Sequence, residues 1–175
     1  LIMKRFVSFL CFIILASTFV FAQQNTVKPN DYNIFYYENG NKSSEGMMRN
    51  GKPDDYWKTY YENGVLKSEG NRKNFLLDST WNFYNENGDI ILQLNYKKGK
   101  KNGIRRTIQE DEILEENFVN DVKQGVSKIY YPGQALKKSI PFTNGLEDGL
   151  AKEYAREDGR VISLIEYKKG FVVSR

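Results

Sequence analysis

The stretch WKTYYENG, residues 57–64, decides the fold because the chain nearly repeats it twice. NIFYYENG stands 24 residues earlier, at 33–40, and WNFYNENG stands 24 residues later, at 81–88. A recurrence at such a spacing is typical of a repeated structural unit rather than of a catalytic signature. Continued along the chain, the period divides it into six units, which begin near Asn33, Trp57, Trp81, Ile104, Val126 and Leu150.

Each unit reads as a β-hairpin followed by a turn to the next hairpin. Its first strand ends at an asparagine–glycine pair in the early units: Asn39-Gly40, Asn63-Gly64 and Asn87-Gly88. Because both residue types accept positive φ, these pairs predict two-residue type I′ turns. A return strand follows, and a second turn, such as Asn50-Gly51 or Asn144-Gly145, leads to the next unit.

The pattern predicts an all-β fold, because no stretch shows sustained helical periodicity with caps. Two strands and two turns per unit, in chain order, make an antiparallel meander of about six tandem β-hairpin repeats. At about 4.8 Å between strands, about twelve strands give an elongated, twisted single sheet of roughly 50–60 Å. We assign residues 33–175 to this repeat domain and 23–32 to a short linker.

The first 22 residues have the three parts of a secretory signal peptide. A basic start at Lys4-Arg5 precedes the apolar run Phe6–Phe21, and Ala22 precedes the expected cleavage site. The alternative is an uncleaved membrane anchor, but the run of 16 residues falls short of the roughly 20 that span a bilayer. We therefore expect an exported protein, periplasmic or extracellular.

Composition excludes several classes of function for residues 23–175. This segment has no histidine and no cysteine, since Cys11 lies in the predicted signal peptide. Most nucleophile–base pairs and nearly all zinc, copper and haem sites are thereby excluded, and we expect no cofactor and no metal. Without Lys4 and Arg5, 24 basic residues face 22 acidic ones, interspersed along the sequence, so we expect no nucleic-acid partner.

The repeat resembles the MORN repeat variant, in which a tryptophan, a tyrosine pair and an asparagine–glycine turn precede an aromatic residue and a glycine–lysine turn. The resemblance covers about residues 33–170 and implies a hairpin-repeat fold. Exported bacterial chains of this family are often labelled YwqK-type antitoxins. The matching residues are Trp57, Tyr60, Tyr61, Asn63, Gly64 and Leu66, and then Trp81, Tyr84, Asn87, Gly88, Ile90, Tyr96, Gly99, Lys100 and Gly103.

Alternation of side chains assigns the aromatic residues to two faces of the sheet. Trp57 and Trp81 fall on one face, which we expect to be the packed one. Tyr36, Tyr60 and Tyr84 fall on the other face, one unit apart, as a ladder. This ladder is our candidate partner-binding face, and the alternative is cross-strand stacking that stabilises a single-layer sheet.

The fourth unit replaces the expected turn by an acidic stretch, Glu110–Glu116. Calcium loops place acids at alternate positions with a glycine between them, which this stretch does not do. We interpret it as a drifted repeat with a solvated acidic tip. No two acidic residues stand out from the others as the pair of carboxylates that a glycosidase needs.

These observations lead to a non-enzymatic repeat protein whose β surface binds a protein or a cell-envelope component. A second hypothesis is an antitoxin or immunity protein that neutralises a specific toxin, and a third is a carboxylate-dependent envelope hydrolase. We expect no transmembrane span after signal cleavage. The terminal hairpins are exposed edges, which offer a dimer interface through edge strands, and the sequence leaves the oligomeric state open.

Overall fold

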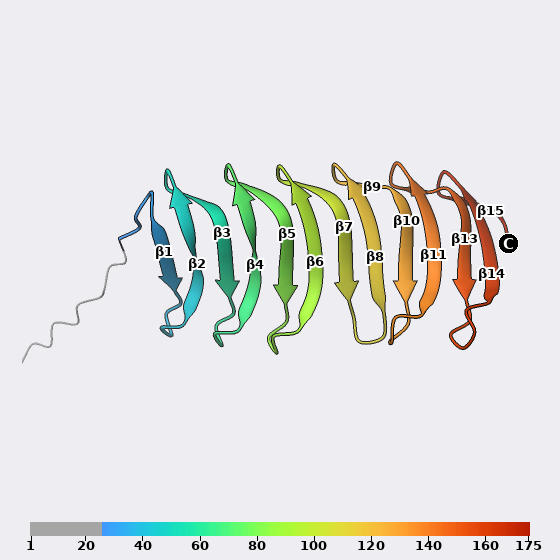
Figure 1. The fold of residues 1–175 in the computed structure, drawn as a ribbon, viewed down its shortest axis with the longest axis horizontal. Coiled ribbons are helices and arrows are strands. Elements are labelled where there is room, and N and C mark those ends of the chain that lie inside the picture. Colours follow the sequence, from blue (N-terminus) through green and yellow to red (C-terminus); the bar gives the residue numbers. More distant parts are fainter. Residues whose placement is uncertain (1–25) are drawn as a thin grey trace, which may run out of the picture.

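The computed structural model describes residues 26–175 as one antiparallel sheet in which the strands follow one another in chain order (Figure 1). The predicted signal peptide and its cleavage site lie outside the described residues. The strands are β1 (Tyr32–Tyr36), β2 (Lys42–Arg49), β3 (Lys52–Tyr60), β4 (Leu66–Lys73), β5 (Leu76–Tyr84), β6 (Ile90–Lys97), β7 (Lys100–Ile108), β8 (Ile113–Val119), β9 (Val122–Lys123), β10 (Gly125–Tyr130), β11 (Leu136–Thr143), β12 (Leu146–Glu147), β13 (Gly149–Tyr154), β14 (Val161–Lys168) and β15 (Phe171–Ser174).

The all-β meander expected from the sequence is confirmed, with 15 strands instead of about twelve. Two of the additional strands, β9 and β12, have two residues each and precede β10 and β13. A glycine with positive φ, Gly125 or Gly149, begins the longer strand in each case, so one expected strand is divided there. The third, β15, pairs with the end of β14.

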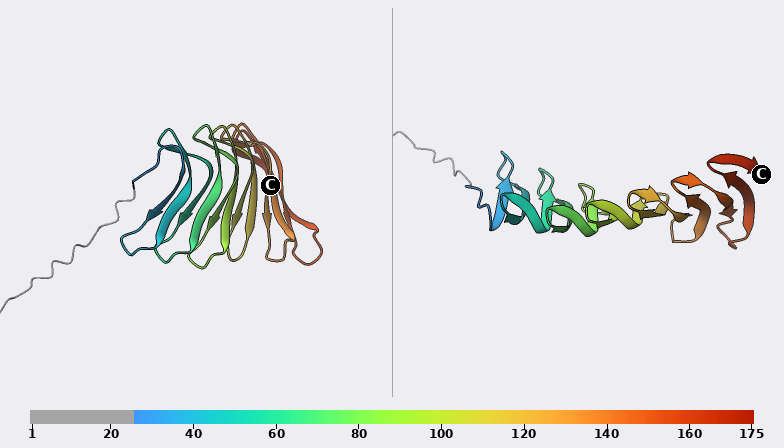
Figure 2. Two further views of the ribbon diagram at one scale, coloured as in Figure 1. Left: turned by 60° about the vertical axis from the view of Figure 1, so that its left-hand side comes forward. Right: turned by 90° about the horizontal axis from the view of Figure 1, so that it is seen from above.

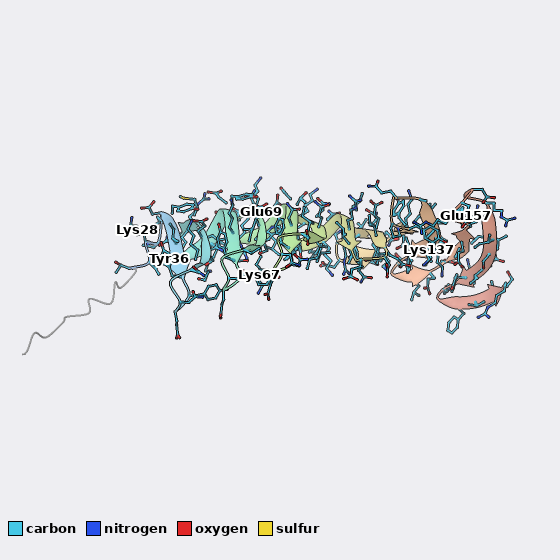
Figure 3. The ribbon with its side chains drawn as sticks, turned by 90° about the horizontal axis from the view of Figure 1, so that it is seen from below. Lys28, Tyr36, Lys67, Glu69, Lys137 and Glu157 are labelled. Carbon is cyan, nitrogen blue, oxygen red and sulfur yellow. The ribbon has the colours of Figure 1, made fainter. Side chains whose placement is uncertain are left out.

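The sheet is a single layer that stays open at both ends (Figure 2). Side chains project from both sides of this layer (Figure 3), and no second layer formed by residues 26–175 covers either face. Residues 26–175 contain no helix long and apolar enough to cross a membrane. Each hairpin therefore packs mainly against its neighbours in the sequence, as in other solenoid-like repeats.

One long side of the sheet, which we call the upper rim, carries the turns that join successive units (Figure 1). The first central residue of these turns has φ of 47–53° and the second 68–85°, the signature of type I′ hairpins. In five of these six turns the second residue also donates its N–H to a carbonyl one unit earlier, as Gly99 does to Leu77 at 2.8 Å, whereas the Phe75 N–H donates to the Asp54 carboxylate at 3.2 Å. The turns are Asn50-Gly51, Asn74-Phe75, Lys98-Gly99, Asn120-Asp121, Asn144-Gly145 and Lys169-Gly170.

The opposite side, the lower rim, corrects our assignment of turn type. Of the pair Asn39-Gly40 only the glycine has positive φ, and the same holds at Asn63-Gly64. Tyr37 N–H donates to the Asn41 carbonyl at 2.8 Å, and Gly40 N–H to the Tyr37 carbonyl at 3.0 Å. These are three-residue loops, a type I turn followed by a left-handed glycine, which is the alternative to type I′ for hairpins. The asparagine oxygen accepts the N–H two residues later, which favours this loop.

The packed face is the one that carries the tryptophans, as the alternation predicts. Trp57 and Trp81 expose only 6% and 4% of their surface. Each ring lies on a glycine of the preceding return strand: a Cβ on Gly46 would lie 2.2 Å from Trp57, and one on Gly70 would lie 2.3 Å from Trp81. The absence of a side chain at these two glycines is what allows each ring to lie directly against the backbone. The surrounding cluster comprises Met48, Phe35, Leu77, Phe83 and Tyr96.

Beyond β6 the same cross-strand row becomes polar. Arg105 pairs with Glu116 across β7 and β8, and Glu116, only 6% exposed, also contacts Lys123. Ser127 and Ala151 continue the buried positions on β10 and β13, at 4% and 2% exposure. A buried carboxylate needs such partners, because an unpaired charge is costly to desolvate. The aromatic–glycine arrangement thus belongs to the first half of the array.

Candidate partner-binding face

The face opposite the tryptophans, here called the tyrosine face, carries the predicted ladder, and the tyrosine hydroxyls are occupied. Tyr60 donates to the Glu45 carboxylate, and Tyr84 donates to Glu69 Oε1 at 2.7 Å. Each glutamate comes from the return strand of the preceding unit. Tyr36 lies on β1 and is 51% exposed, and its hydroxyl makes no hydrogen bond within residues 26–175. The ladder therefore consists of two anchored tyrosines and one free one.

The ladder continues into the second half of the array, which sequence reasoning missed. Tyr130 donates to Glu115 Oε2 at 3.0 Å, and Tyr154 lies 3.2 Å from the Ser139 hydroxyl. Ile108 interrupts the series in the fourth unit. The signal that reveals these pairs is the constant offset of 15 residues between each tyrosine and its partner.

Partial burial and the neighbouring glutamates raise the pKa values of Tyr60, Tyr84 and Tyr130. The pKa of Tyr84 is raised from 10.0 to about 12, first by desolvation and then by its hydrogen bond and proximity to Glu69. Desolvation and Glu45 raise the pKa of Tyr60 in the same way. The hydroxyls are thus held neutral and act as donors to the carboxylates. This arrangement supports the structural reading of the ladder, in which the tyrosines join neighbouring units.

We expect Glu69→Gln to lower the pKa of Tyr84, while desolvation keeps it above 10. A tyrosine whose pKa is raised by folding stabilises the fold fully below the unfolded value of about 10, and this stabilisation disappears as pH rises toward 12. A titration of tyrosinate absorbance, with Tyr84→Phe subtracted to isolate Tyr84, measures the shift. The same pKa for Tyr84 in the wild type and in Glu69→Gln would contradict the assigned pairing.

A second row on the tyrosine face is apolar and solvent-exposed. It occupies one position per unit, four residues before the ladder position, and only the third unit is polar there, with Thr80. We call it the exposed row, and its members are 45–52% exposed. The sequence analysis did not predict this row, although its positions recur in the sequence every 24 residues, or 22 residues in one case. Its members are Tyr32, Tyr56, Ile104, Val126 and Leu150.

Charged residues of both signs separate the two rows. Lys58 Nζ lies 3.9 Å from Glu69, and Arg106 Nε lies 3.7 Å from Glu115. In the fifth unit Lys128 occupies the corresponding position and lies opposite Glu115 in the register of β10 and β8. The tyrosine face thus combines an apolar row, a row of mixed charge and a row of anchored hydroxyls. Such a surface offers apolar area and hydrogen-bonding groups together, as protein interfaces do.

The acidic stretch of the fourth unit does not form a separate site. Glu112 contacts Lys137, Glu115 accepts from Tyr130, and Glu116 lies between Arg105 and Lys123. Residues 26–175 contain no group of three or more acidic, histidine or cysteine side chains that could hold a metal ion. Glu112, Glu115 and Glu116 instead pair with residues of other strands.

Comparison with known proteins agrees with the period and the geometry. A search of curated proteins found no match. Residues 56–74 and 77–98, which form most of β3–β6, each match the MORN repeat variant. Repeats of this kind are generally protein- or membrane-binding modules without catalysis of their own. The structure continues the same hairpin unit on both sides of the matched segments, so two MORN repeat variant units lie within a longer array of similar hairpins.

Proposed function

We propose that this chain is an exported, non-enzymatic binding module that contacts a partner protein through its tyrosine face. The observation that carries the proposal is the exposed row. Monomeric sheets usually place polar residues on a solvated face, whereas here one apolar side chain per unit is about half exposed in five of the six units. Regular repetition of such a position creates a contact strip along the sheet, which Thr80 interrupts in the third unit.

The charges beside the exposed row favour a protein over a membrane surface. Glu45, Glu69 and Glu115 lie along the middle of the tyrosine face, and anionic lipid would repel them. Lys58 and Arg106 lie beside them. A protein partner can match both signs, which fixes its register along the sheet. Tyr36, at the start of the face, contributes an exposed aromatic ring and a free hydroxyl to this contact.

The test compares capture of partners from an envelope fraction by the wild type and by Ile104→Glu/Val126→Glu. Both residues are about half exposed, so we expect the variant to keep its stability to within about 0.5 kcal/mol. We expect it to lose the captured partner, because two carboxylates would be desolvated in the middle of the contact.

The matched control is Phe171→Glu/Val172→Glu, which makes the same change of charge at exposed positions of β15, outside the exposed row. This control should capture the same partner as the wild type. Equal capture of the partner by all three proteins, or loss of capture only by the β15 variant, would contradict a contact through the tyrosine face.

A further inference from the structure

Charge is segregated between the two rims. The first four turns of the lower rim, at 37–41, 61–65, 85–89 and 109–112, contain seven acidic residues and no lysine or arginine. On the upper rim, β6, the turn Lys98-Gly99 and β7 place four lysines within five residues, 97–101. In the first four units the hairpin topology therefore places acids along the lower rim and lysines at this upper-rim turn. An anionic ligand is attracted to one long side of the sheet and repelled from the other.

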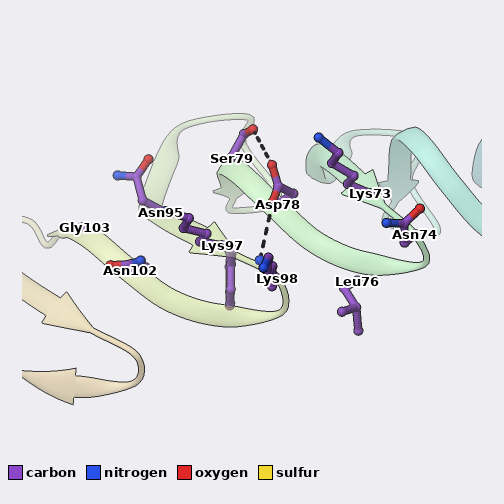
Figure 4. A pocket seen from close by; sticks show the side chains of 11 residues that line it. Lys73, Asn74, Leu76, Asp78, Ser79, Asn95, Lys97, Lys98, Asn102 and Gly103 are labelled. Atoms are coloured by element: carbon purple, nitrogen blue, oxygen red, sulfur yellow. Dashed lines mark hydrogen bonds between the residues drawn. The ribbon is translucent and has the colours of Figure 1, made fainter.

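The upper rim is hollowed on both sides of the lysine-rich turn. A pocket of about 710 Å³ lies between this turn and the turn at Asn74-Phe75 (Figure 4). A second hollow, of about 410 Å³, lies between the lysine-rich turn and Asn120. Lys97, Lys98 and Asn102 line both. Two adjacent hollows that share the same cationic side chains form one elongated site.

Comparison with the preceding unit explains why the pocket is open. Between the first two upper-rim turns, the Phe75 ring lies 5.5 Å from Lys52 Nζ, and Asp54 is paired with Arg49 at 3.2 Å. One unit later, Gly99 stands where Phe75 stands, so no ring projects into the space.

The residues that line the larger pocket are cationic and hydrogen-bonding. Lys73, Lys97 and Lys98 make no ion pair with any carboxylate within residues 26–175, and the lining contains one acid, Asp78. That carboxylate, on β5, accepts hydrogen bonds from the Ser79 hydroxyl at 3.1 Å and from the Lys98 N–H of the lysine-rich turn at 3.4 Å. The cations are thus free for an external anion.

Asn102 is the residue that links the two hollows. It stands where the earlier units have Asp54 and Asp78, so the third unit has lost a carboxylate at this position. The side chain is half-buried and makes no hydrogen bond within the described residues, which leaves its carboxamide able to donate and to accept. Together with Asn74 it suits hydroxyl groups, whereas the lysines suit carboxylates. Tyr96 adds an aromatic wall to the larger pocket.

We propose that this upper-rim site binds an acidic glycan, a polysaccharide whose sugars carry carboxylates. Carboxylates pair with Lys73, Lys97 and Lys98, and sugar hydroxyls bond to the carboxamides of Asn74 and Asn102. The hollows belong to successive units about 10 Å apart, so that one polymer chain occupies both. A membrane is a poorer fit, because Asn102, which lines both hollows, is half-buried between the turns. The site is independent of the tyrosine face.

The test measures binding of polygalacturonate to the full chain by calorimetry, with neutral dextran for comparison. We expect polygalacturonate to bind, more weakly at higher salt, and dextran not to bind. Lys73→Gln/Lys97→Gln/Lys98→Gln should lose roughly tenfold in affinity. The control, Lys128→Gln/Lys138→Gln/Lys152→Gln, removes three lysines that also lack ion pairs but lie outside both hollows, and should bind within about twofold of the wild type.

Asn102→Asp is a second variant, and we expect it to fold as the wild type does because the earlier units carry aspartate at this position. It should weaken polygalacturonate binding roughly threefold through repulsion of the carboxylates. Equal affinities of the two lysine triple variants would overturn the proposal. Tighter binding to polyphosphate or to vesicles of phosphatidylglycerol than to polygalacturonate would also overturn it, in favour of a phosphate ligand.

Discussion

Trp81→Ala is expected to lower the free energy of unfolding by about 3–5 kcal/mol, the usual cost of removing a large buried aromatic side chain. The ring is 4% exposed, contacts Phe83 with a centroid distance of 6.4 Å, and donates its Nε1–H to the Asn71 carbonyl at 2.9 Å. Its removal leaves the backbone of Gly70 uncovered in a sheet with no second layer. Urea denaturation followed by circular dichroism measures the loss.

The control for this variant is Tyr56→Ala, on the opposite face. Tyr56 is 49% exposed, with Lys58 Nζ 6.0 Å from its ring and Glu69 beside its hydroxyl, so the change should cost much less than that of Trp81. Equal losses of stability for the two variants would contradict the assignment of the packed face.

Gly70→Ala is expected to destabilise the protein by about 2–3 kcal/mol, at the upper end of the range for overpacking. The new Cβ would lie 2.3–2.5 Å from three atoms of the Trp81 ring, so the ring must shift. In the Trp81→Ala background the same substitution should cost little, because the obstructing ring is absent. The double-mutant cycle therefore predicts a coupling between Gly70 and Trp81. Additive losses would show that the glycine is needed for another reason.

The sequence predicted the elements and the faces well, because both depend on local rules. Alternation placed Trp57 and Tyr60 on opposite faces, and the structure confirms it, since one is buried and the other bonds to Glu45. The turn type was wrong for Asn63-Gly64. The pair is compatible with two hairpin loops, and the loop length, set by the pairing of Tyr61 N–H with the Val65 carbonyl, decides between them.

Properties that depend on residues one or more units apart were not predictable from the motif alone. The partners of Tyr84 and Tyr130 became clear only when the register placed each beside a glutamate from the preceding unit. The upper-rim pocket likewise results from a change between units, the glycine at 99 in place of Phe75. A repeat motif describes what the units share, whereas these features arise where the units differ.

The most direct test of the central claim, that the tyrosine face contacts a partner protein, is site-specific photo-crosslinking. A photoreactive residue is placed at Val126, in the exposed row, and in a second protein at Phe171, which is 76% exposed on β15. Both proteins are exposed to the same envelope fraction. We predict a discrete cross-linked protein from Val126 that is missing from Phe171. Cross-links from Phe171 alone, or none from Val126, would contradict the account.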